Sequence, residues 1–212
     1  MSPRPASAIS GLYLLTRETA DSAALLDGTA AAVAGGARVV QYRDKSADPE
    51  RRHAQATALA ALCHAQGVPL IINDDVDLAR RVGADGVHLG AGDATVAAAR
   101  AVLGTSCIIG VSCYDDESRA RRAVAEGADY LAYGAFFASG TKPLAGRAPL
   151  TLLESASRLG RPVVAIGGID AHNGGRLVAA GASALAVLGA VWDAADMRAA
   201  ARAISSLFPA QG

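Results

Sequence analysis

Residues 36–45 read GARVVQYRDK, and this stretch contains the pattern that predicts the fold of the chain. Gly36 stands where a helix would end, because glycine readily takes the left-handed position that follows a helix. Residues 39–42 then form a short, buried strand that begins with two β-branched side chains. Gln41, Arg43 and Lys45 alternate, so in an extended chain they project to one side. The stretch predicts a helix end, a buried strand and a polar strand end, in that order.

The same pattern of short apolar runs and longer Ala-rich segments recurs along the whole chain. Gly-Ala pairs precede every second predicted strand, at residues 36–37, 83–84, 127–128 and 181–182. Helical segments such as 50–66 and 118–126 separate the strands. The predicted strands are residues 12–15, 39–42, 70–72, 86–89, 108–111, 130–133, 163–166 and 185–188. The repeating unit is therefore two strands and two helices, a quarter of an eight-stranded fold.

Strict alternation of strand and helix indicates an α/β protein with a parallel sheet and right-handed crossovers. Eight such units in 212 residues predict a (βα)₈ TIM barrel. An open, doubly wound sheet is the alternative, but it does not require this eight-fold regularity, and no GxGxxG motif follows the first strand. We expect one domain over residues 1–212, with residues 1–10 as a short N-terminal extension.

The composition excludes several classes of function. Lys+Arg and Asp+Glu both number 20, whereas a nucleic-acid-binding protein typically has a basic surplus. Residues 1–10 lack the apolar segment of a signal peptide, and no apolar run is long enough to span a membrane. Three cysteines without a CxxC spacing are typical of a reduced compartment. We expect a cytoplasmic protein that binds small molecules, and neither nucleic acid nor membrane.

Two carboxylates at neighbouring strand ends suggest a metal site. Asp74 follows the third predicted strand and Asp93 follows the fourth, and in a barrel both lie on the same rim. Mg²⁺ prefers oxygen ligands and is often held by one or two carboxylates plus substrate phosphates. The alternative is that Asp74 or Asp75 caps the third helix and Asp93 caps the fourth, since aspartate is a favoured N-cap.

Basic and small residues on the same rim suggest that the ligand carries phosphate. Arg43, Lys45 and Lys142 suit a diphosphate, although they could also be ordinary surface charges. The Gly167-Gly168 pair offers backbone N–H groups near a helix start, in a region where barrels often bind phosphate, but a tight turn would explain it equally. The long loop at residues 137–147 follows the sixth strand on this rim, and its hydroxyls could donate to phosphate.

Short motifs at the strand ends resemble those of the thiamine phosphate synthase family. They are QYRDK (41–45), INDD (72–75), DGVHLG (85–90), GVS (110–112), GAFFASGTK (134–142) and AIGGI (165–169). The resemblance covers essentially the whole chain. It implies a (βα)₈ barrel that uses one Mg²⁺ ion per chain to join a pyrimidine diphosphate to a thiazole phosphate, with release of pyrophosphate.

The resemblance also implies roles for individual residues. Arg43, Lys45 and Lys142 would be catalytic, and Asp74 and Asp93 would hold the metal ion. Contacts to the pyrimidine diphosphate would come from Gln41, Tyr42, Arg43, Asp44, Lys45, Asn73, Ser112 and Lys142. The thiazole phosphate would contact Ser139, Gly140, Thr141, Gly168, Leu188 and Gly189.

Three positions depart from the family pattern. Ala138-Ser139-Gly140 replaces the usual Pro-Thr-x, Ala91 stands where glutamine is usual, and Gly189 stands where serine is common. These changes bear on the affinity for thiazole phosphate more than on the diphosphate site.

The expected chemistry is a dissociative alkyl transfer, in which the protein supplies charge and position and no nucleophile. Three alternatives remain open. A related thiazole tautomerase would need a general base, and a Schiff-base aldolase would use Lys45 or Lys142 as nucleophile. A non-catalytic barrel would only bind the phosphate ligand. His88 is expected to be a hydrogen-bonded strand residue rather than a ligand.

Overall fold

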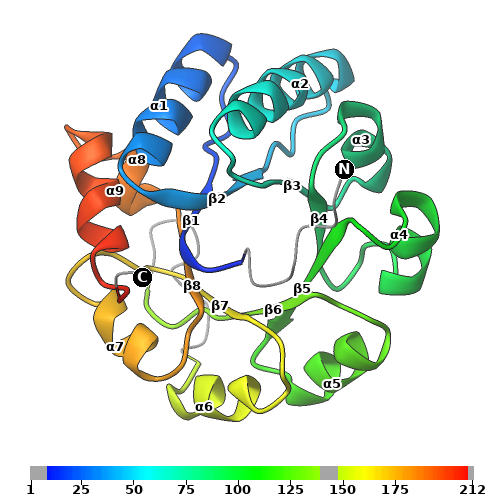
Figure 1. Ribbon diagram of the computed structural model, residues 1–212, viewed down its shortest axis with the longest axis vertical. Helices are drawn as coiled ribbons and strands as arrows, with labels where there is room; N and C mark the ends of the chain where they lie inside the picture. Colours follow the sequence, from blue (N-terminus) through cyan, green and yellow to red (C-terminus); the bar gives the residue numbers. More distant parts are fainter. Residues whose placement is uncertain (1–8, 139–147, 210–212) are drawn as a thin grey trace.

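The computed structural model describes residues 9–138 and 148–209. Eight parallel strands close into a barrel in the order in which they occur in the chain, and helices surround it (Figure 1). The strands are β1 (Gly11–Leu15), β2 (Ala37–Tyr42), β3 (Leu70–Asn73), β4 (Gly86–Leu89), β5 (Ile108–Tyr114), β6 (Tyr130–Tyr133), β7 (Val163–Ile166) and β8 (Ala184–Val187). The predicted TIM barrel is confirmed, and the open sheet is excluded because β1 pairs with β8.

Helices follow the strands, and most of the described ones begin at a side chain that accepts a backbone hydrogen bond. The helices are α1 (Ser22–Ala34), α2 (Pro49–Ala65), α3 (Val76–Val82), α4 (Val96–Leu103), α5 (Glu117–Ala125), α6 (Thr151–Ser157), α7 (Gly174–Ala179), α8 (Gly189–Trp192) and α9 (Met197–Ser205). Asp48 caps α2 and Asp116 caps α5, so both helices begin one residue before their predicted starts. Among the described residues, no helix has both the length and the apolar character needed to cross a bilayer.

The two faces of the barrel have separate apolar cores. One core joins the outward side chains of the strands to the surrounding helices. The other contains mainly alternate strand residues, with none from a helix, and therefore fills the barrel interior. Tyr13, Val39 and Tyr130 belong to this inner core. Because the side-chain period of a strand is two, Gln41 continues the inward face after Val39, and Tyr42 faces the helices.

The glycines of the repeat serve the turn from helix to strand. Gly83 caps α3 with φ +65°, and a Cβ there would meet no atom within 4 Å, so the requirement is for backbone conformation and not for space. Gly110 in β5 shows the opposite requirement, because a Cβ would lie 1.9 Å from Cζ of Tyr130. Its missing side chain leaves room for the Tyr130 ring inside the barrel.

Candidate functional site

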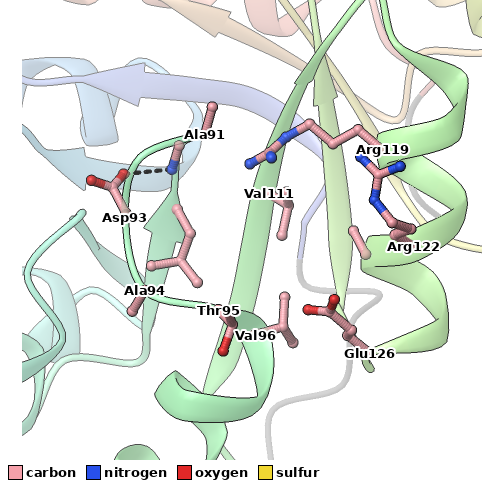
Figure 2. Close-up of a pocket in the computed structure, with 12 residues that line it drawn as sticks. Ala91, Asp93, Ala94, Thr95, Val96, Val111, Arg119, Arg122 and Glu126 are labelled. Atoms are coloured by element: carbon pink, nitrogen blue, oxygen red, sulfur yellow. Dashed lines mark hydrogen bonds between the residues drawn. The ribbon is translucent and has the colours of Figure 1, made fainter.

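The carboxyl ends of β3 and β4 bring Asp74 and Asp93 together. Asp74 follows β3, where its backbone N–H donates to the carbonyl oxygen of His88 in β4 at 2.8 Å. Its φ of +63° lies in the left-handed region, which aspartate tolerates better than most residues, so the chain turns sharply there. Asp93 lies in the loop after β4, and its Oδ2 accepts a hydrogen bond from the Gly90 N–H at 2.6 Å (Figure 2).

The alternative that these aspartates are helix caps holds for only one residue. Asp75 caps α3, and its side chain accepts from the Leu78 N–H at 2.8 Å. Thr95, and not Asp93, caps α4. Asp74 and Asp93 are therefore left available for another role.

The two carboxylates influence each other's protonation. Burial raises the pKa of Asp93 above its ordinary value, and the hydrogen bond and negative charge of Asp74 raise it further. The Lys45 ammonium acts in the opposite direction and forms an ion pair with Asp74. Two carboxylates this close favour a bound cation, which would relieve their repulsion.

The donor set at this position fits Mg²⁺. Within residues 9–138 and 148–209, no group of three or more His, Cys, Asp or Glu side chains could enclose a metal ion. Two carboxylates alone suit an ion that keeps several waters and takes further oxygen ligands from substrate phosphates. The pair therefore fits the magnesium site expected from the sequence.

The residues that follow β2 separate into two groups. Lys45 and the inward-facing Gln41 lie on the side of the carboxylate pair. Arg43 is partly buried, and its backbone N–H donates to Oγ1 of Thr16 at 3.0 Å. Tyr42 and Asp44 point instead to α2. The Tyr42 hydroxyl donates to Oε1 of Gln55 at 2.9 Å.

Asp44 is held by an arginine of α2. Its carboxylate pairs with Arg51 at 3.1 Å. Although burial acts to raise the pKa of Asp44, hydrogen bonds from Ser46 and Arg51 hold it below its ordinary value. The structure therefore does not bring the side chains of Tyr42 and Asp44 together with the other predicted substrate contacts.

Ser112 at the end of β5 is positioned by two groups that the sequence did not identify as functional. Its Oγ is hydrogen-bonded to Nε2 of His88 at 2.8 Å, and its carbonyl oxygen accepts from Nε of Arg119 at 2.6 Å. His88 is thus a buried, hydrogen-bonded strand residue, as predicted. Arg119 comes from α5 and reaches across Val111 toward the loop that carries Ala91 and Asp93 (Figure 2).

This arginine borders a cavity of about 130 Å³ between the loop after β4 and α5. Figure 2 shows Asp93 on one side of the cavity and Arg119 on the other. The sequence did not identify Arg119 because it lies seven positions after Ser112 on another element, and only the packing of α5 against β5 brings the two into contact.

The predicted thiazole phosphate side is described in part. Ser139, Gly140 and Thr141 lie outside the described residues, as does Lys142 of the predicted diphosphate site. Gly168 has φ +62°, and a Cβ there would lie 2.3 Å from the Ala138 carbonyl oxygen, so the turn after β7 requires glycine.

Gly189 begins α8, directly after Leu188. A Cβ at Gly189 would lie 3.0 Å from Oδ2 of Asp193, which is ion-paired with Arg17. The carboxylate of Asp193 therefore borders the space that a side chain at position 189 would occupy.

Comparison with known proteins identifies the family. The family model described as thiamine monophosphate synthase matches residues 12–191. The chain belongs to this family. The family predicted from the strand-end motifs is confirmed, and the chain is an enzyme of the transferase class.

Relatives in this family match along nearly their whole length. The chain is 55% identical to the thiamine-phosphate synthase of Chromobacterium violaceum over 203 residues, covering 96% of this chain and 98% of that protein. It is also 55% identical to the thiamine-phosphate synthase of Thiobacillus denitrificans, covering 95% and 96% of the two chains. Among solved structures, the thiamine phosphate pyrophosphorylase of Pyrococcus furiosus matches with a TM-score of 0.84 at 30% identity, over 95% of this chain and 96% of that one.

The buried His88 predicts a pH dependence of folding stability in this family member. Burial lowers the pKa of His88 from 6.5 to about 4. Between these values the unfolded chain binds a proton at this imidazole that the folded chain does not bind, so stability decreases as the pH is lowered from 6.5 toward 4. The decrease by about pH 4.5 should reach roughly 2–3 kcal/mol, at about 1.4 kcal/mol per pKa unit.

Urea unfolding of the wild-type chain and of His88→Asn at about pH 7 and pH 4.5 measures this contribution. Titrating carboxylates act in both proteins, so the difference between them isolates the imidazole. The wild type should lose about 2–3 kcal/mol more than the variant on acidification. An equal loss in both proteins would contradict the assignment.

Proposed function

We propose that this chain catalyses the Mg²⁺-dependent condensation of 4-amino-2-methyl-5-(diphosphooxymethyl)pyrimidine with 4-methyl-5-(2-phosphooxyethyl)thiazole, giving thiamine phosphate and pyrophosphate. The observation that carries the proposal is the Asp74–Asp93 carboxylate pair, with the Lys45 ammonium against it, on the rim beside Gln41 and Ser112. Family membership supports the substrate pair. The absence of a CxxC spacing among the cysteines supports a cytoplasmic location.

In the proposed reaction, the bond between the pyrimidine methylene carbon and the diphosphate oxygen breaks first, and its electron pair leaves with pyrophosphate. The electron-rich aminopyrimidine stabilises the cation that remains. The thiazole nitrogen then donates its lone pair to the methylene carbon, which forms the new C–N bond. No proton or protein nucleophile is required for this exchange of bonds.

The chain's own residues bind and orient the reactants. Asp74 and Asp93 would hold Mg²⁺, which when bound would neutralise charge on the diphosphate. Lys45 is held at the site by its ion pair with Asp74 and would also contact the diphosphate. Arg43 and Lys142 are assigned to the same anion, so that the charge of the leaving group meets several fixed cations.

Two of the alternative functions receive less support from the described residues. A tautomerase needs a general base, but both ring nitrogens of His88 are engaged in hydrogen bonds, and its imidazole is a weak base because burial lowers its pKa to about 4. A Schiff-base mechanism needs a free lysine amine, but Nζ of Lys45 is engaged in an ion pair with Asp74. A barrel that only binds phosphate ligands would give no pyrophosphate in an assay with both substrates.

Neutralising either carboxylate should abolish turnover without unfolding the chain. In Asp74→Asn and Asp93→Asn the metal site loses one negative charge, and asparagine tolerates the left-handed backbone at position 74. We expect the rate of pyrophosphate release, with both substrates and Mg²⁺, to decrease by about two orders of magnitude or more.

The matched control is Asp75→Asn, which changes the neighbouring residue but retains an N-cap side chain on α3. It should keep near wild-type turnover. If Asp74→Asn and Asp93→Asn also keep near wild-type rates at limiting Mg²⁺, the carboxylate pair is not a metal site.

The order of bond breaking is tested by the electronics of the pyrimidine. Replacing its methyl group with trifluoromethyl withdraws electrons and destabilises the cation, so the single-turnover rate should fall steeply, by about a hundredfold or more if the cation loses about 3 kcal/mol of stabilisation. An associative displacement would respond much less. Single-turnover measurement is needed so that product release does not mask the chemical step. Equal rates for the two substrates would contradict a dissociative mechanism.

A further inference from the structure

A continuous chain of hydrogen bonds crosses the interior of the barrel from β2 to β5. Tyr13 and Tyr130 join their hydroxyls at 2.8 Å, and the Tyr130 hydroxyl is 2.8 Å from Nδ1 of His88. His88 Nε2 is 2.8 Å from Oγ of Ser112. At the other end, the side-chain amide of Gln41 lies within hydrogen-bonding reach of the Tyr13 hydroxyl and acts to lower its pKa.

The inner members of this chain are buried among apolar side chains. The exposed fraction is 2% for Tyr13 and 0% for Tyr130, and the imidazole of His88 stacks on the Tyr130 ring with centroids 5.6 Å apart. Within the described part of the molecule, the two hydroxyls and the imidazole have no hydrogen-bond partners other than the members of this hydrogen-bonded series. An unpaired donor is costly in such apolar surroundings, so each buried donor is expected to find its acceptor within this series of hydrogen bonds.

The number of protons on these groups permits only two arrangements of donors and acceptors in which every contact is a hydrogen bond. Each tyrosine hydroxyl has one proton, and a neutral imidazole has one N–H. If Tyr13 donates to Tyr130, then Tyr130 donates to Nδ1, and Nε2–H donates to Ser112. If Tyr130 donates to Tyr13, the imidazole must donate from Nδ1, and Nε2 accepts the Ser112 proton. A mixed arrangement would leave one of these 2.8 Å contacts with no proton or with two, so that lone pairs or protons would face each other in the buried interior.

The two arrangements present opposite polarity to the site. In the first, the Ser112 hydroxyl proton is free to donate to a ligand, and Gln41 donates to Tyr13 and keeps its carbonyl oxygen free. In the second, Ser112 offers only lone pairs, and Gln41 uses its oxygen on Tyr13 and has its NH₂ group free. An aminopyrimidine edge offers both an acceptor ring nitrogen and a donor amino group, so in a given orientation it matches only one of these states.

Resting on the proposed function, we propose that Tyr13, Tyr130 and His88 are positioning residues that couple Gln41 to Ser112, so that both ends of the chain switch hydrogen-bond polarity together when the aminopyrimidine binds. The three residues do not touch the reacting atoms. They act by fixing the imidazole tautomer, and through it the direction in which the Ser112 hydroxyl points.

Nitrogen-15 NMR of the His88 ring tests the coupling in the free protein. Tyr13→Phe leaves the Tyr130 proton only Nδ1 as acceptor, so His88 should take the Nε2–H tautomer, although Tyr13 does not contact His88. Ser112→Ala removes the acceptor at Nε2, so His88 should take the Nδ1–H tautomer. If His88 has the same tautomer in both variants, the coupling does not exist.

Steady-state kinetics test the effect on the reaction. Tyr13→Phe and Tyr130→Phe should each lower kcat/KM for the pyrimidine diphosphate about tenfold, the equivalent of one lost hydrogen bond, and leave the KM for the thiazole phosphate unchanged. The double variant should lose no more than Tyr130→Phe alone, because either change breaks the same chain. Additive losses would contradict the coupling.

Tyr133→Phe is the matched control. Tyr133 lies on the same strand as Tyr130 but in the outer core, and its buried hydroxyl has no hydrogen-bond partner among the described residues, so this variant should behave as wild type. If Tyr130→Phe and Tyr133→Phe have equal kinetic constants, Tyr130 has no positioning role. Absence of pyrophosphate release from the wild-type enzyme would instead reject the proposed function. The NMR comparison decides the coupling in either case.

Discussion

The pairing of β3 with β4 is the interaction on which the site depends. Asn73 lies opposite His88 in the ladder, and the next residue, Asp74, continues it with the hydrogen bond from its N–H to the His88 carbonyl. The chain then turns through the left-handed conformation of Asp74. Because this turn follows a ladder of fixed register, the Asp74 carboxylate lies beside Asp93 in the next loop. A shift of one residue would reverse every side chain and separate the pair.

Barrel closure also explains how polar groups exist in the interior. Alternate residues of all eight strands point inward, and most of them are apolar or small. Gln41, His88 and Ser112 belong to the inward set near the rim, and the Tyr13 and Tyr130 hydroxyls connect them deeper in the barrel. Each of these groups is hydrogen-bonded, so the polar chain gives the interior a defined arrangement without leaving an unsatisfied donor.

Most of the fold was predictable from local sequence, because the strand period and the glycine stops are local signals. The strands predicted at residues 86–89, 130–133 and 163–166 have the same bounds as β4, β6 and β7. The fifth strand was predicted to end at residue 111, but pairing with β6 continues it to Tyr114 through an irregularity in register. Such an extension depends on the partner strand and is not visible in the strand's own sequence.

The site was less predictable because its contacts are distant in sequence. Tyr13 and Tyr130 are 117 residues apart in the sequence. Neither residue's sequence context indicates that its hydroxyl forms a hydrogen bond inside the barrel. The outward direction of Tyr42 and Asp44 follows from the period of two, but the motif resemblance had grouped them with Gln41 as substrate contacts. The motif identified the family, and only the fold separates the residues that face the site from those that anchor the loop to α2.

The most direct test of the account is a titration with Mn²⁺, a spectroscopic substitute for Mg²⁺, followed by electron paramagnetic resonance. The account predicts one ion per chain, bound weakly to the free protein and at least tenfold more tightly with the pyrimidine diphosphate, since phosphate oxygens complete the ligand set. Asp93→Asn should remove this binding, and Asp75→Asn should not. An ion that binds equally well without the diphosphate, or equally well to Asp93→Asn, would contradict the central claim.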